Sequence, residues 1–154
     1  DRFGIVSERA VLLDQLSVIQ NLAMPYSLEI EPPAADIRHQ AIALALDAGL
    51  PETTWDRPSG ELDATGRMRV RLARALAFNP SLLVLEHPSA TIARGDVATF
   101  ARDVRALAQR RGAAAITLTM DREFARGAGA RALTLEPATG HISEGWFSRI
   151  GLRP

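Results

Sequence analysis

The sequence contains neither cysteine nor lysine. The 18 residues that count as Lys or Arg are all arginine, and three histidines accompany them. Without cysteine the chain has no disulfide and no thiolate ligand for a metal ion. Without lysine it cannot perform any chemistry that needs a lysine ammonium group.

The chain also has few aromatic residues and no net charge. Aromatic residues make up 5%, and 18 basic residues balance 18 acidic ones. Such a chain has no overall field to attract nucleic acid and few rings to stack on bases, so nucleic acid is not an expected partner. No apolar run reaches the roughly 20 residues that span a membrane. The first residue is Asp rather than Met, and the start does not resemble a signal peptide, so we expect a chain cut from a longer protein or processed.

Short apolar segments predict the strands of a sheet. They lie at 3–6, 82–85, 114–118 and 132–135, and Gly140 predicts a turn to a hairpin partner near Ile142. Continuous apolar runs of this kind are typical of strands buried on both faces of a parallel sheet.

Helical segments alternate with these strands. We expect helices after Ser17, over 35–48, from Asp63 to about Phe78, from Asp96 to about Arg111, and after Asp121. Ser17, Asp63 and Asp96 are candidate N-caps, because their side chains accept hydrogen bonds from free N–H groups of the first turn. The alternation predicts an α/β fold with a mostly parallel sheet, and 154 residues suffice for one compact domain.

One stretch carries a family pattern. Residues 62–90 read LDATGRMRVRLARALAFNPSLLVLEHPSA, and they resemble the signature helix and Walker B strand of ABC ATPases. Further matches follow in the family's order. Residues 2–22 resemble the strand, Q-loop and LSVxxN helix, residues 57–62 the approach to the signature, and residues 115–121 the strand that ends in the switch histidine.

The resemblance implies a P-loop NTPase-like fold, with helices flanking a mostly parallel sheet. All of 1–154 would be a portion of one ABC ATPase domain. Its helical signature subdomain would span approximately 17–78, and the catalytic core would comprise 1–16 and 79–154.

The resemblance also assigns residues to a site, and most of them depart from the family pattern. Glu86 stands at the Walker B Asp, whose carboxylate contacts Mg²⁺ through water. His87 stands at the catalytic Glu, and a neutral imidazole can accept a proton but lacks a permanent negative charge. Glu8 replaces the Q-loop glutamine, Met120 replaces the switch histidine, and Ala93 replaces the D-loop Asp. We therefore expect hydrolysis to be weakened.

The signature itself is altered. The family's LSGGQ corresponds to Leu62, Asp63, Ala64, Thr65 and Gly66, so both central glycines are lost. A helix N-terminus offers N–H groups and a positive dipole end to phosphate. Here the absent glycines hinder close approach of the backbone, and Asp63 adds a repelling charge.

The resemblance implies ligands and partners as well. ATP and Mg²⁺ would bind between two cassettes, and a membrane-embedded transporter subunit would be the second partner. The protein would be cytoplasmic, held at the inner face of the membrane through that subunit. Coupling would run through residues 9–50. The large side chains there are candidates either for a partner groove or, with equal weight, for core packing: Leu12, Leu13, Leu16, Met24 and Tyr26.

The Walker A loop, GxxxxGK followed by Ser or Thr, is absent, because the chain has no lysine. In the family it lies upstream of the Q-loop, and its strand lies between the strands at 114–118 and 132–135. We therefore expect an incomplete core with a gap in the sheet, and no ATP hydrolysis by this chain alone. An upstream part of the same protein is the favoured source of the loop. A partner that supplies it, or a rearranged sheet, are the alternatives.

Several residues also have simpler interpretations. His87 can be a polar residue at a strand end. Arg67, Arg71 and Arg74 share a helical face, where we expect solvation or ion pairs with Asp or Glu. The side chains Met68, Met120, Trp55, Trp146 and Phe147 are expected to be packing residues. For the whole domain, the main alternative to an ATP-binding transport subunit is a degenerate ABC-like domain with a structural or regulatory role. A soluble ABC protein of translation or DNA repair is disfavoured, because basic or aromatic surfaces and long inserted arms are missing.

Overall fold

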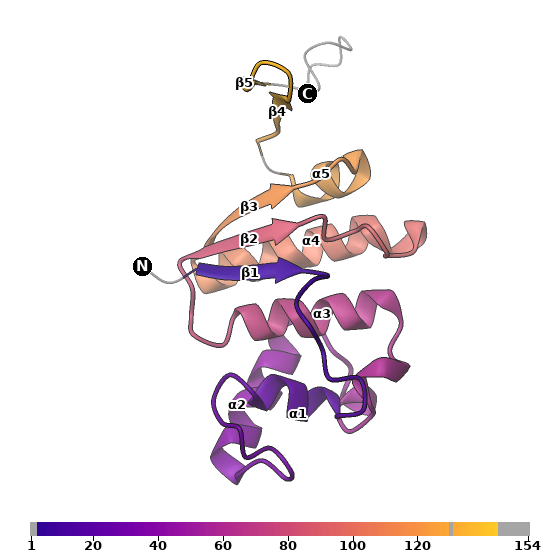
Figure 1. Ribbon diagram of the computed structural model, residues 1–154, viewed down its shortest axis with the longest axis vertical. Helices are drawn as coiled ribbons and strands as arrows, with labels where there is room; N and C mark the ends of the chain where they lie inside the picture. The colour runs from indigo at the N-terminus through magenta and orange to yellow at the C-terminus, as the bar shows by residue number, and fades with distance from the viewer. Residues whose placement is uncertain (1–2, 130, 145–154) are drawn as a thin grey trace.

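A three-stranded parallel sheet organises the molecule. The computed structural model describes residues 3–129 and 131–144, so Trp146 and Phe147 lie outside the described residues. The sheet contains β1 (Phe3–Ser7), β2 (Leu82–Glu86) and β3 (Ala114–Leu118), in the order β1-β2-β3 (Figure 1). Strands β4 (Leu133–Glu136) and β5 (His141–Glu144) form a separate antiparallel hairpin. The predicted strands are confirmed to within one residue at each end.

Helices lie against one face of the sheet and beside it. Helix α4 (Arg94–Arg111) covers one face, with α5 (Arg122–Ala128) packed on α4 (Figure 1). Helix α3 (Ala64–Ala75) packs beside β1, and α1 (Val18–Ala23) and α2 (Ala35–Asp47) pack together beyond it. Two short 3-10 helices, η1 (Glu52–Thr54) and η2 (Ser59–Glu61), lead into α3. None of the helices in the described residues combines the length and apolarity needed to cross a membrane.

Two of the three predicted N-caps, Ser17 and Asp63, are confirmed, and Asp121 caps α5 as well. Ser17 forms a complete capping box with Gln20, Asp63 accepts from the Gly66 N–H, and Asp121 accepts from two N–H groups of α5. The prediction for Asp96 is wrong, because α4 begins at Arg94 and has no side-chain cap. Asp96 lies in the first turn instead, where its negative charge is favourable near the positive end of the helix dipole.

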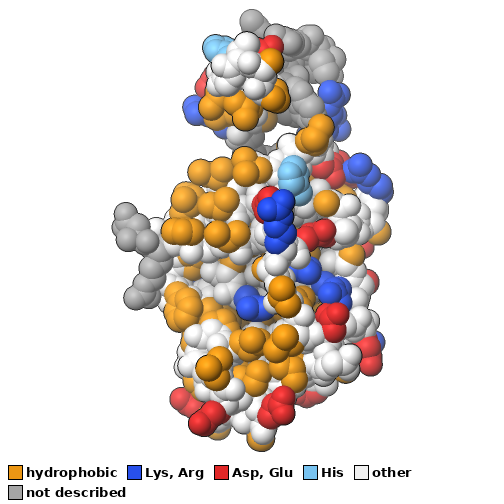
Figure 2. All heavy atoms as spheres, viewed as in Figure 1, with side chains coloured by type: hydrophobic (Ala, Val, Ile, Leu, Met, Phe, Trp, Pro, Cys, Tyr) orange, Lys and Arg blue, Asp and Glu red, His pale blue; other side chains and the backbone are white. Residues whose placement is uncertain are grey.

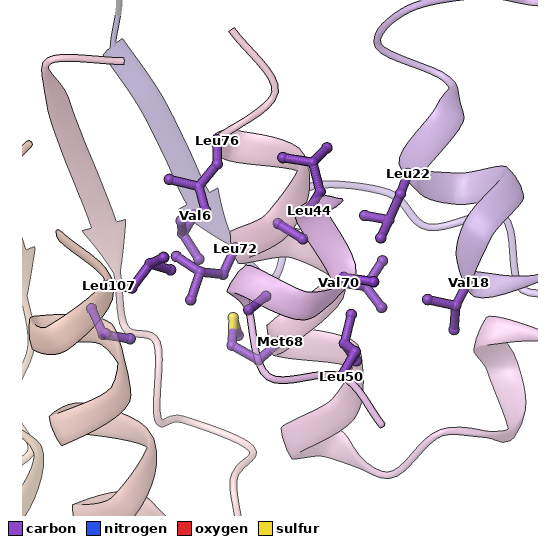
Figure 3. Close-up of a cluster of buried hydrophobic side chains, with 14 of the residues drawn as sticks. Val6, Val18, Leu22, Leu44, Leu50, Met68, Val70, Leu72, Leu76 and Leu107 are labelled. Carbon is purple, nitrogen blue, oxygen red and sulfur yellow. The ribbon is translucent and has the colours of Figure 1, made fainter. Parts of the chain in front are cut away.

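The main core joins the sheet to the helices. Val6, Leu72, Leu76 and Leu107 come together from β1, α3 and α4, and Leu22 continues the same cluster into α1 (Figure 3). Each is at most 1% exposed. Full burial of a side chain of this size stabilises the fold by about 1.5–3 kcal/mol, so α3 is held by apolar contacts on both of its sides.

Most of the candidate groove residues belong to this core. Leu12 is buried, and Leu16, Met24 and Tyr26 pack against the core. The Tyr26 hydroxyl donates to the Ala77 carbonyl at 3.1 Å. Core packing is therefore the role that the structure gives these four residues. Leu13 is the exception, since it is 41% exposed. Trp55 is also a packing residue, as predicted, and its ring N–H donates to the Leu50 carbonyl.

A buried asparagine fixes the path of the chain between β1 and α1. The Asn21 side chain is fully buried, and its amide nitrogen lies within hydrogen-bond distance of the carbonyls of Leu13, Leu16 and Ser17 and of the Ser59 hydroxyl, which share its two N–H donors. Its carbonyl oxygen accepts from the Leu13 N–H at 2.9 Å. Buried polar groups of a loop need such partners, so one side chain holds this loop between α1 and η2.

The other face of the sheet is open. Ile5 and Ile116 flank Val84 in one row across the strands, and both are more than half exposed, at 55% and 54%. Phe3 and Leu118 lie on the same face, at 65% and 57%. Hydrophobic side chains gather over the strands in the space-filling view (Figure 2). The prediction that the strands are buried on both faces is therefore wrong for this chain. No described helix covers the face that carries Ile5 and Ile116.

The predicted gap in the sheet is present. Among the described residues β3 pairs only with β2, and β4 belongs to a different sheet. One edge of β3 therefore has unpaired backbone groups, as expected for an incomplete P-loop NTPase-like core.

Candidate functional site

The three parallel strands end at one edge, and this edge gathers half of the predicted site. Ser7, Glu86 and Leu118 are register partners at the ends of β1, β2 and β3. The residues that follow these ends therefore lie near one another. In α/β folds, ligands bind in the crevice outside the carboxyl ends of the strands.

Glu86 is held in place by the end of β1. Its Oε2 accepts a hydrogen bond from the Ser7 hydroxyl at 2.8 Å, and its Oε1 lies 3.8 Å from the Arg9 guanidinium. The Glu86 side chain is 34% exposed, so the carboxylate can still reach water. No group of three His, Asp or Glu side chains in the described part of the chain could hold a metal ion. A bound Mg²⁺ usually keeps several waters beside one or two carboxylates, so Glu86 alone would need further ligands, such as phosphates, from elsewhere.

His87 occupies a restricted backbone conformation. Its φ is 44°, in the left-handed region that few residues other than glycine adopt. Its N–H donates to the Leu118 carbonyl at 2.9 Å, which extends the pairing of β2 with β3 by one bond. The imidazole is exposed at the edge of the sheet. The sequence pattern did not indicate this left-handed conformation of His87.

Glu8 connects two loops of the edge. Its carboxylate accepts a hydrogen bond from the Thr91 hydroxyl, so the loop after β1 is tied to the turn after β2. This places Glu8 beside the turn that begins with His87. Sequence reasoning missed Thr91.

Met120 follows β3 and is 86% exposed. The prediction that it is a core packing residue is therefore wrong. It lies at the edge that the resemblance implies, but a thioether cannot donate a hydrogen bond.

Asp121 has several hydrogen-bond partners at this edge, and the sequence pattern indicated only that a helix follows it. Its carboxylate accepts from the Ser89 hydroxyl at 2.9 Å and from Arg94 at 2.8 Å, and it caps α5. Burial acts to raise the pKa of Asp121, but the hydrogen bonds from Ser89 and from two backbone N–H groups, together with Arg94, lower it overall. The ionised carboxylate thus joins the turn after β2 to the start of α5.

We expect Asp121→Ala to lower the free energy of unfolding of the chain by about 1–2 kcal/mol at neutral pH, because a cap and a hydrogen-bond acceptor are lost. The folded pKa lies below the ordinary value of 3.8. The stabilisation is therefore full above that value and is lost as pH falls through the folded pKa. Urea unfolding at neutral and acidic pH measures the difference, which should shrink in acid. Asp56→Ala is the control, since its exposed ion pair with Arg38 contributes little. An equal loss at both pH values would contradict the electrostatic account.

The altered signature lies at the start of α3, apart from this edge. Asp63 accepts from the Gly66 N–H at 2.7 Å, and the Thr65 hydroxyl donates to Asp96 at 3.2 Å. Ala64 is the first residue of the helix. No hydrogen bond or ion pair within the described ranges joins residues 63–66 to Glu86 or His87. The N–H that would face a phosphate already binds the chain's own carboxylate, so this helix start does not fit phosphate unless Asp63 moves.

Arg67, Arg71 and Arg74, three of the four arginines of α3, have different partners. Arg67 forms an ion pair with Asp14 at 3.0 Å, as predicted. Arg71 and Arg74 instead donate to backbone carbonyls of the loop after β1. The prediction of solvation or ion pairs is therefore wrong for these two.

Known proteins similar to this chain are ATP-binding proteins. No family model matches the chain. It is 35% identical over 89 residues to the lipoprotein-releasing system ATP-binding protein LolD of Psychrobacter arcticus, covering 58% of this chain and 39% of that protein. It is 30% identical over 125 residues to LolD of Acinetobacter baylyi, covering 81% and 54%. The chain thus spans about half or less of the length of these relatives.

Solved structures with a similar fold are ABC cassettes. A dimeric bacterial ABC transporter cassette matches with a TM-score of 0.67 and 22% identity, over 82% of this chain and 56% of that one. A Clostridium perfringens protein that is part of an ABC transporter complex matches with a TM-score of 0.65 and 23% identity, over 77% and 47%. The solved structures show the fold, and the similarity in sequence shows the homology. The chain is a homologue of ABC transporter ATP-binding proteins and corresponds to their C-terminal portion.

Proposed function

We propose that this chain is the C-terminal portion of the ATP-binding subunit of an ABC transporter, which couples ATP binding to a membrane partner and in which hydrolysis is weakened. One observation carries the proposal. Glu8, the adjacent pair Glu86 and His87, and Met120 come from three distant parts of the sequence, yet all lie at or just after the ends of the three parallel strands. That edge is where an α/β fold binds its ligand.

The edge provides a carboxylate that would hold Mg²⁺ but no phosphate-binding loop for ATP. Magnesium, when bound, neutralises the charge that develops on the phosphates, and Glu86 is the carboxylate that would hold it through water. The phosphate-binding loop would come from elsewhere, since the chain has no lysine. The open face and the unpaired edge of β3 are where a further strand and helix would complete the core.

The altered side chains support weak hydrolysis. His87 is exposed and lacks the permanent negative charge of a carboxylate, so it orients and activates a water less effectively. Met120 is exposed but offers no hydrogen bond to a phosphate. Asp63 caps its own helix and would repel a phosphate presented by a second cassette. Dimeric cassettes among the structural relatives support such a second cassette as partner.

The location follows from the same resemblance. The protein would be cytoplasmic and would reach the inner face of the membrane through the transporter subunit to which it is coupled.

The test is ATP binding by the natural protein that carries this chain. We expect Mg²⁺-dependent binding of a fluorescent ATP analogue, displaced by unlabelled ATP. Failure to bind any nucleotide would overturn the proposal. It would favour the second candidate, a degenerate domain with a structural or regulatory role. That candidate is supported by the departures at Glu8, Asp63, Glu86, His87 and Met120.

A further inference from the structure

Arg94 is the first residue of α4, and its side chain reaches across to the loop after β3. Its Nη1 donates to the Asp121 Oδ2 at 2.8 Å. The same carboxylate oxygen accepts a hydrogen bond from the Ser89 hydroxyl at 2.9 Å. The loops that follow β2 and β3 leave the sheet at the same end (Figure 1), so this guanidinium lies where the two loops meet.

This meeting point adjoins two altered positions of the proposed nucleotide site. Asp121 directly follows Met120, and Ser89 follows His87 after a single intervening residue. The His87 N–H also donates to the carbonyl of the last residue of β3 at 2.9 Å, which ties the turn after β2 to the end of that strand. Arg94 is therefore placed beside both altered positions.

The Asp121 carboxylate does not depend on Arg94 for its partners. Its Oδ1 accepts from the N–H groups of Glu123 and Phe124 at 3.0 and 3.3 Å, and its Oδ2 accepts from the Ser89 hydroxyl. Burial raises the pKa of Asp121, and among the groups that lower it the Ser89 hydroxyl and the two N–H groups each act more strongly than Arg94. Each carboxylate oxygen would keep a partner if the guanidinium turned away.

The Arg94 guanidinium keeps donors for a further anion. Its side chain is 76% exposed, and an ion pair with so exposed a partner adds little to stability. Within the described ranges its hydrogen bond to Asp121 uses one N–H group, whereas a guanidinium has five. Arg9 also lies at this edge, but its partner is Glu86, the carboxylate that would hold Mg²⁺.

A phosphate group is the anion that suits this position. In phosphoryl transfer the charge is spread over the oxygens of the terminal phosphate, and nearby positive groups and hydrogen-bond donors stabilise that charge. The thioether of Met120 cannot donate a hydrogen bond. A guanidinium offers paired N–H groups that match two phosphate oxygens, and it stays protonated at neutral pH. Arg94 thus offers beside Met120 what Met120 itself lacks.

We infer that Arg94 binds the terminal phosphate of ATP at this edge and supplies the donor that Met120 cannot. Asp121 holds the guanidinium in place before nucleotide binds. When the guanidinium turns to the phosphate, Asp121 retains Ser89 and the start of α5 as partners. The inference rests on the proposed function and deepens it, because it names a residue that distinguishes ATP from ADP.

The binding of two nucleotides tests the inference on the natural protein. The probes are AMP-PNP, an ATP analogue that is not hydrolysed, and ADP, each with Mg²⁺, and calorimetry measures both affinities. We expect Arg94→Gln to weaken AMP-PNP binding about tenfold, as the loss of a charged hydrogen bond would. ADP binding should change by less than about twofold, because ADP has no terminal phosphate. A purely structural role for Arg94 would weaken the binding of both nucleotides equally.

Two further variants locate the effect. Arg94→Lys should recover part of the lost affinity, because lysine keeps the charge but not the paired N–H groups. Arg102→Gln is the matched control, since Arg102 is an exposed residue of the same helix whose side chain donates to Thr99; neither affinity should change. Thermal unfolding checks that each variant is folded.

The outcomes separate this inference from the proposed function. An equal loss of affinity for both nucleotides, no loss for either, or the same loss from Arg102→Gln would overturn the inference and leave the proposed function standing. Failure of the unaltered protein to bind either nucleotide would overturn the proposed function, and the inference with it.

Discussion

We expect His87→Glu to raise the rate of ATP hydrolysis by the natural protein by about a hundredfold. A positioned general base contributes about 10²- to 10⁴-fold to a proton transfer. We expect the lower end, because Glu8 and Met120 still depart from the family pattern. His87 directly follows β2, and its side chain is exposed at the edge of the sheet. A carboxylate at the same position would carry the permanent charge that holds and activates a water. Release of phosphate under saturating Mg·ATP measures the rate.

The matched control for this substitution is His87→Gln. Glutamine has the shape of glutamate but no charge and no basic group, so turnover should not rise. Both variants share the cost of a left-handed backbone, where φ is 44° and histidine is better tolerated than most residues. Stability should therefore fall equally, by less than about 1 kcal/mol. A rise with glutamine as well would mean that histidine blocks the site sterically. No turnover in either variant would support the degenerate domain.

The sequence predicts the sheet well, because its signals are local. The clearest strand is a continuous apolar run that ends at a polar residue, 82–85 before Glu86, with the breaker Pro88 shortly after. The positions of Glu86 and His87 follow directly, since a residue that ends a parallel strand must lie at the carboxyl edge of the sheet. This is why the strands, and the site residues that lie at their ends, could be placed without the structure.

The connections within the site could not be predicted, because they depend on contacts between distant residues. The Thr91 hydroxyl meets Glu8 across 83 positions of sequence, and Ser7 meets Glu86 across 79. Hydroxyl residues are frequent in loops, and no spacing rule singles out these two. The exposure of Met120 has a similar origin. A methionine after a buried strand is usually covered, and here no described element lies over the end of β3.

The second large effect is expected at the open face of the sheet. Ile116 is at the centre of β3, in one row with Val84 and Ile5, and is 54% exposed in this chain. In the chain alone, Ile116→Glu should change the free energy of unfolding by no more than about 0.5 kcal/mol, as surface substitutions usually do. In the natural protein we expect a loss of about 3 kcal/mol or more, because the remainder of the cassette would cover this face and bury an unpaired charge.

Comparing the cost of Ile116→Glu in the chain alone and in the natural protein shows whether the open face of the sheet is covered in the natural protein. Leu28→Glu is the control, since Leu28 is 89% exposed and lies away from the sheet; it should cost little in either protein. Urea unfolding of the wild type and both variants gives the differences. A small cost for Ile116→Glu in both proteins would mean that the face stays open, and that a phosphate-binding half does not pack there. A large cost in the natural protein alone would place that half on the row of Ile5, Val84 and Ile116, directly beside the edge that carries Glu86 and His87.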